Sequence, residues 1–77
     1  MDKYLKQLGN FIKKERKKRL LTQTDLANLS EVSVTFIVNI ERGKTSAEVG
    51  KLLKVLSVLG VQLNIGFGKN IINIEGK

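Results

Sequence analysis

The chain has 77 residues, 42% of them hydrophobic, and it contains neither cysteine nor histidine. A domain of this size lies near the lower limit of what one hydrophobic core stabilises alone. Because disulfides and the common zinc sites are excluded, self-association is the remaining way to reinforce it. The sequence shows no apolar run long enough to span a bilayer and no signal peptide, so we expect a cytoplasmic protein.

The formal net charge is +7, from 14 basic and 7 acidic residues. Residues 1–20 hold eight of the basic groups and two of the acidic ones. Charge concentrated in this way favours a polyanionic partner, either nucleic acid or a membrane surface, and the alternative is a solvated lysine-rich helix face. The basic run lacks the interleaved large apolar residues of an interfacial membrane helix, which favours nucleic acid.

Hydrophobic spacing predicts an amphipathic helix over residues 3–19 that ends in the basic run 13–19. A second, short helix follows over residues 23–30. Thr22 is its predicted N-cap, and Asp25 stands three residues on, near the positive end of the helix dipole. The start of this helix is therefore well marked in the sequence.

Ser33 is the next predicted N-cap, for a third helix over residues 34–41 that stops at Gly43. A capping-box pattern over residues 45–48 then opens a fourth helix, roughly residues 46–60. Beyond it the apolar residues alternate, which predicts a strand over residues 61–67. We expect one domain over residues 1–67, with 68–77 as a short tail or a second strand.

The second and third predicted helices have the dimensions of a helix-turn-helix. The matching residues are Leu21-Thr22-Gln23, Leu26-Ala27, Val32-Ser33, Ile37 and Ile40-Glu41-Arg42-Gly43-Lys44. With this combination, residues 8–60 resemble the Cro/repressor-like helix-turn-helix family, also called the xenobiotic-response-element family. Leu20 and Glu31 stand where that family often has glycine.

The resemblance implies a mainly α, four-helix, lambda-repressor-like domain that binds DNA. The residues it places against base edges are Val34, Thr35, Val38 and Asn39. The residues it places against phosphates are Gln23, Thr22, Ser33, Arg42, Lys44 and Lys18. Valine offers a base only apolar contact, so we expect modest sequence selectivity or recognition of DNA shape.

Some residues of the motif are better explained by structure than by DNA contact. We expect Arg16 to form an ion pair with Glu41 across the helical bundle. Tyr4 and Phe11 are expected to pack in the core or at its edge, and not to stack on bases.

Apolar residues cover more than half of the circumference of the fourth helix, and those expected to face the core are Val49, Leu52, Leu53, Leu56 and Leu59. This excess of apolar surface predicts a two-fold dimer; the alternative is that the core of a single protomer buries more of the helix. The strand would pair with its copy across the dimer or fold back on residues 71–74 as a hairpin. The expected interface residues are Val55, Val58, Leu59, Val61, Leu63 and Ile65.

A fourth helix followed directly by a strand is similar to the architecture of HipB-type antitoxins. That resemblance implies a homodimeric repressor that binds a palindromic operator, autoregulates its operon and binds a HipA-type kinase toxin. The alternatives are a protein-interaction module that mainly restrains a toxin or other partner, and a stand-alone phage-type regulator. We expect no catalytic site, cofactor or metal, and a nucleoid-associated protein of bacterial or phage origin.

Overall fold

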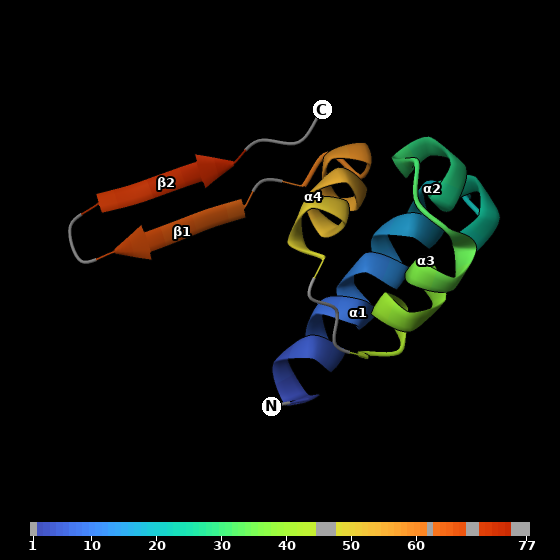
Figure 1. Cartoon of the computed structure of the whole chain (residues 1–77), viewed down its shortest axis with the longest axis horizontal. Coiled ribbons are helices and arrows are strands. Elements are labelled where there is room, and N and C mark those ends of the chain that lie inside the picture. Colours follow the sequence, from blue (N-terminus) through green and yellow to red (C-terminus); the bar gives the residue numbers. More distant parts are fainter. Residues whose placement is uncertain (1, 45–47, 62, 68–69, 75–77) are drawn as a thin grey trace.

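The structure is a computed structural model that describes residues 2–44, 48–61, 63–67 and 70–74. Its elements are α1 (Asp2–Lys18), α2 (Gln23–Ser30), α3 (Val34–Glu41), α4 (Val49–Val58), β1 (Leu63–Phe67) and β2 (Asn70–Ile74). Figure 1 shows the helices gathered into one body, with the two strands extending from the side of α4. Within the described ranges, no helix is long and apolar enough to cross a membrane.

The hydrophobic core lies between the four helices. Helix α2 packs against both α3 and α4, and α1 packs against α3. The buried apolar side chains are Ile12, Leu26, Ala27, Phe36, Ile37, Ile40, Val55, Leu56 and Leu59. Ala27, the smallest of these side chains, is fully buried.

The two predicted N-caps of the helix-turn-helix are confirmed. The Thr22 hydroxyl accepts a hydrogen bond from the backbone N–H of Asp25 at 2.9 Å, and the Asp25 carboxylate accepts one from the backbone N–H of Thr22 at 2.9 Å. The Ser33 hydroxyl accepts from the backbone N–H of Phe36 at 3.0 Å. Both helices therefore begin where the side-chain chemistry of their caps requires.

Two helices of the body end without glycine, and the residues found there adopt the glycine-like conformation themselves. Leu20 follows α1 with φ 57°, and Glu31 caps the C-terminus of α2 with φ 59°. Both lie in the left-handed region, which costs an L-residue about 1–2 kcal/mol. At the end of α3, Gly43 has φ 77°, as its predicted place after the helix requires.

Helix α4 is shorter than expected, and its first residue lies outside the core. It begins at Val49, and Glu48 at its N-cap makes no side-chain capping bond; residues 45–47 of the expected capping box lie outside the described residues. Its buried residues are Val55, Leu56 and Leu59, whereas Val49 is 61% exposed. The expected core position of Val49 is therefore wrong, whereas Val55 and Leu59 are buried within the protomer core.

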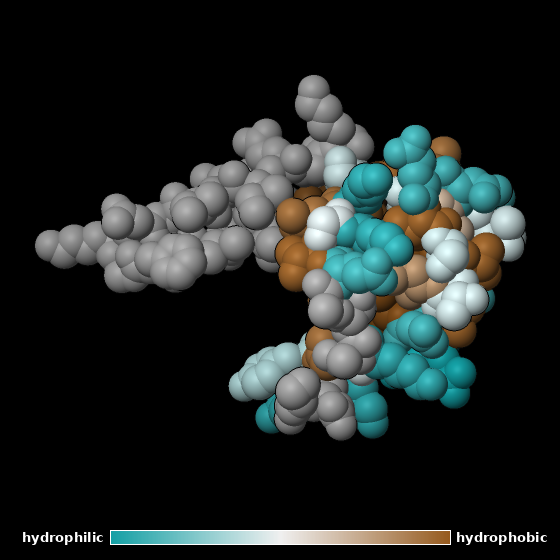
Figure 2. Space-filling view, viewed as in Figure 1, coloured by the Kyte–Doolittle hydropathy of each residue, from teal (hydrophilic) through white to brown (hydrophobic). Residues whose placement is uncertain are grey.

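β1 and β2 pair antiparallel, with Leu63 opposite Ile74 and Phe67 opposite Asn70. The chain thus folds back on itself after α4. Figure 2 shows apolar surface over α4, at the side of the helical body from which these strands leave.

The two aromatic residues of α1 are more exposed than the sequence suggested. Tyr4 is 74% exposed and Phe11 is 41% exposed. The expectation that Tyr4 packs in the core or at its edge is wrong. Helical spacing located the apolar side of α1 correctly at Ile12, but it did not fix how far the first turns extend past the neighbouring helices.

Candidate nucleic-acid interface

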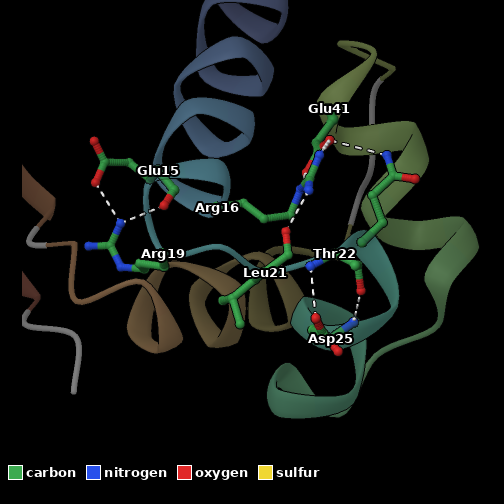
Figure 3. Close-up of polar contacts among 8 residues, drawn as sticks. Glu15, Arg16, Arg19, Leu21, Thr22, Asp25 and Glu41 are labelled. Atoms are coloured by element: carbon green, nitrogen blue, oxygen red, sulfur yellow. Dashed lines mark hydrogen bonds and ion pairs between the residues drawn. The ribbon is translucent and has the colours of Figure 1, made fainter.

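A buried ion pair holds α3 against α1. The Arg16 guanidinium donates to the Glu41 carboxylate through Nε at 2.6 Å and through Nη2 at 3.0 Å, which confirms the predicted pair (Figure 3). The side chains are only 8% and 2% exposed. Because two parallel hydrogen bonds fix the geometry of an arginine–carboxylate pair, this contact sets both the distance and the angle between the helices.

The same two side chains also hold the start of α2. Arg16 Nη1 donates to the backbone oxygen of Leu21 at 2.7 Å, and Gln23 Nε2 donates to Glu41 Oε1 at 3.1 Å. Glu41, at the C-terminal end of α3, is thus bonded to both helices that precede it. Removal of one partner would leave a buried charge without compensation, which typically costs 3–5 kcal/mol.

Two glycines allow α1 and the end of α3 to approach backbone to backbone. A Cβ at Gly9 would lie 2.4 Å from the backbone oxygen of Ile40 and 2.8 Å from that of Glu41. A Cβ at Gly43 would lie 2.9 Å from Cα of Lys6. The role of Gly9 was not predicted. The available signal in the sequence was a glycine inside a predicted helix, where glycine is otherwise unfavourable.

The two sides of α3 have different surroundings. Phe36, Ile37, Ile40 and Glu41 are buried. On the other side lie the four expected base contacts: Val34 and Thr35 are exposed, and Val38 and Asn39 are partly exposed. Within the described residues, the Asn39 side-chain amide makes no hydrogen bond, so it can bond an external partner.

The expected phosphate contacts are placed less uniformly. Arg42 and Lys44 are exposed just after α3, and neither forms an ion pair within the described part of the chain. Gln23 uses one amide N–H on Glu41 and keeps a second for another acceptor. Lys18 instead lies 3.4 Å from the carboxylate of Glu15.

The hydroxyls of Thr22 and Ser33 act as cap acceptors, and the O–H group of Ser33 remains available as a donor. The capping geometry also affects acid–base behaviour. The backbone N–H of Thr22, and then its hydroxyl, lower the pKa of Asp25 below the ordinary value of 3.8. Asp25 therefore stays negatively charged at the N-terminus of α2, where the helix dipole favours an anion.

Arg19 and Lys51 make the contacts that position α4. Arg19 donates to the backbone oxygen of Leu59 and to the Glu15 carboxylate, the latter at 2.8 Å. This contact with Arg19 is the main cause that lowers the pKa of Glu15. Lys51 of α4 lies over the Phe36 ring, 5.8 Å from its centre. Arg19 thus connects the end of α4 to the end of α1, and Lys51 connects α4 to α3.

Comparison with known proteins agrees with this arrangement. The helix-turn-helix family profile matches residues 12–65. An uncharacterized HTH-type transcriptional regulator, y4mF, of Sinorhizobium fredii is 40% identical over 58 residues, which are 75% of this chain and 76% of that protein. The ImmF control region 10 kDa protein of Bacillus phage phi105 is 32% identical over 60 residues, 78% of this chain and 67% of that protein. The chain therefore belongs to the helix-turn-helix family.

Proposed function

We propose that this protein is a DNA-binding transcriptional repressor that places α3 in the major groove. The observation that carries the proposal is the placement of α3. One side of this helix is held by the buried Arg16–Glu41 pair, while Val34, Thr35 and Asn39 lie on the other side. An α-helix fits the major groove, and base contacts need side chains that are held rigidly but left accessible.

The proposed base contacts differ in chemistry. Asn39 has a donor and an acceptor on one amide and can bond the N6 and N7 edge of adenine. Thr35 can donate to a base or a phosphate, whereas Val34 and Val38 can only contact apolar groups such as the thymine methyl. Selectivity then rests on few hydrogen bonds, and DNA shape contributes a larger share.

The proposed phosphate contacts surround this surface. Gln23, Thr22 and Ser33 would donate from the N-terminal ends of α2 and α3, and Arg42, Lys44 and Lys18 would add positive charge. The net charge of +7 supports a phosphate partner, because such contacts release counterions and strengthen binding at low salt.

We further propose that the protein acts as a homodimer on a palindromic operator. Of the expected interface residues, Val58 and Val61 are partly exposed at the end of α4, and Leu63 and Ile65 lie in β1. A two-stranded hairpin is only marginally stable in water, which favours its burial against a second copy. A dimer would place the two α3 helices about one helical turn of DNA apart.

A salt-titrated gel shift with footprinting on the DNA upstream of the gene tests the repressor proposal. We expect a footprint with two half-sites about one turn apart and an affinity that falls steeply with salt. No binding to any duplex at low salt would refute it. Equal binding to upstream and random duplexes would reduce the protein to a non-specific DNA binder.

Substitution Asn39→Ala separates base contact from phosphate contact. If Asn39 bonds a base, the loss is about 1–3 kcal/mol and is confined to one operator position. Uniform weakening on all sequences would assign Asn39 to a phosphate. Dimerisation is tested by sedimentation and by the unfolding temperature, which rises with protein concentration only if folding and association are coupled.

The more detailed biological role is a proposal that rests on architecture. The succession of α4 and β1 supports an autoregulating antitoxin of the HipB type, with a HipA-type kinase toxin as partner. The similarity to a control-region protein of a Bacillus phage supports a phage-type regulator instead. Co-purification of a kinase from the native host favours the antitoxin and its second role in restraining the toxin; isolation as a homodimer alone favours the phage-type regulator.

A further inference from the structure

The N-terminal half of α1 meets the chain that follows α3. The Cβ position of Gly43 lies 2.7 Å from Cγ of Lys6 and 2.9 Å from its Cα, so the main chains of the two segments are in contact. Lys44, the next residue, lines an apolar groove together with Leu5 and Leu8 of α1. Figure 1 shows the same arrangement, with the C-terminal end of α3 beside the first turns of α1.

This contact brings together three cations from distant parts of the sequence. Lys6 comes from α1, and Arg42 and Lys44 flank Gly43. All three are exposed, and none forms an ion pair within the described ranges. The carboxylate next to Arg42 and Lys44 along the chain, that of Glu41, is buried and bonded to Arg16 and Gln23.

We propose that Lys6, Arg42 and Lys44 form one phosphate-binding cluster, and that Lys6 is a DNA contact supplied from outside the helix-turn-helix. Like charges on neighbouring segments repel one another in the free protein. A bound polyanion compensates that repulsion and is attracted by all three cations. The proposal rests on the DNA-binding function proposed above and specifies where the backbone of the duplex passes. It passes the C-terminal end of α3, next to the first turns of α1.

The chemistry of the cluster indicates the phosphodiester backbone and not a base. Lysine is a flexible point charge, and exposed lysines and arginines beside a helix end contact phosphates without reading sequence. Lys6 should therefore contribute equally on every duplex. This separates its effect from that of Asn39, which is expected at one operator position.

The test measures binding of Lys6→Gln to a mixed-sequence duplex about three helical turns long over a series of salt concentrations. Loss of one phosphate contact lowers the slope of log affinity against log salt by about 0.9. If the contribution of this contact vanishes at 1 M salt, the affinity of Lys6→Gln at 0.1 M salt is roughly eightfold below that of the wild type. Lys44→Gln should produce the same change, and Lys6→Arg, which keeps the charge, should restore the wild-type slope.

The matched control is Lys14→Gln, which removes the same charge from the same helix. Lys14 is exposed and forms no ion pair in the described part of the chain. It lies about 12 Å along the helix axis from Lys6 and about 140° around it from Gly9, the residue that meets α3. At 0.1 M salt the Debye length is about 10 Å, so we expect less than about a twofold effect.

The outcomes separate the cluster from the function on which it rests. If the wild-type protein binds no duplex at low salt, DNA binding itself is refuted. If it binds and Lys6→Gln matches Lys14→Gln, the cluster is refuted while DNA binding stands. An equally low affinity for Lys6→Arg, or an unfolding midpoint that falls while the salt slope is unchanged, would assign Lys6 a structural role and also overturn the proposal.

Discussion

Gly9→Ala tests the close contact between α1 and α3 directly. An added Cβ would lie 2.4 Å from the Ile40 oxygen and 3.0 Å from the Glu41 carbonyl carbon. The obstructing atoms belong to the backbone, so no side chain can rotate away. The helices would have to separate by about 1 Å, and overpacking of this kind typically costs 1–3 kcal/mol.

Alanine also improves helix propensity by about 1 kcal/mol relative to glycine, so the net loss should be about 1 kcal/mol. For a domain of this size, whose total stability is about 4–12 kcal/mol, that loss lowers the unfolding temperature by roughly 4–8 °C. The variant should still fold. Gly50→Ala is the matched control, because nothing lies within 4 Å of its Cβ position and the residue is also helical. It should gain about 0.5 kcal/mol.

The assay is urea unfolding followed by circular dichroism, with the three proteins compared at one protein concentration. We expect the midpoint of Gly9→Ala to fall and that of Gly50→Ala to stay or rise, at a common slope. A Gly9→Ala protein as stable as Gly50→Ala would refute the backbone contact and, with it, the relative placement of α1 and the end of α3.

Further predictions concern the motif and its ends. Leu20→Gly should raise stability by about 1 kcal/mol, because φ 57° is left-handed and Leu20 is 90% exposed. The control Leu29→Gly, inside α2, should lower stability by a similar amount. A loss of stability in both variants would show that Leu20 makes a stabilising contact. Glu41→Gln should lower stability by about 3 kcal/mol, with much of the loss recovered when Arg16→Met is added, as a double-mutant cycle measures. The pKa of Asp25 is lowered on folding, so its contribution is present above its ordinary value of 3.8 and is lost as pH falls through the folded value. Asp25→Asn should remove this contribution, so that the unfolding temperature of the variant changes less than that of the wild type between melts recorded above and below these two pKa values. An equal change in both proteins would contradict the capping role.

The sequence predicted best those features that depend on neighbouring residues. Both N-caps of the helix-turn-helix depend on residues three positions apart, and the structure confirms them at Thr22 and Ser33. Gly43 likewise takes its predicted left-handed place after α3. The predicted Arg16–Glu41 pair is the exception, because its residues stand 25 positions apart, and the structure confirms it as well.

Features set by helix rotation and crossing were not predictable from spacing. The apolar residues of α4 cover so much of its circumference that the pattern does not define which of them face the core. The structure selects Val55 over Val49. The roles of Gly9 and Lys6 were not predicted for a related reason. Only the crossing of α1 and α3 brings Gly9 against the backbone of α3 and Lys6 against Gly43.

The division of α3 into a held side and an accessible side has a consequence for how such a protein can change. The residues that fix its position, Ile37, Ile40 and Glu41, are buried, whereas Val34 and Thr35 are exposed. Substitutions at exposed positions usually change stability by no more than about 0.5 kcal/mol. A library at positions 34 and 35 should therefore yield folded proteins almost throughout, so that new operator preferences can be selected without loss of the scaffold.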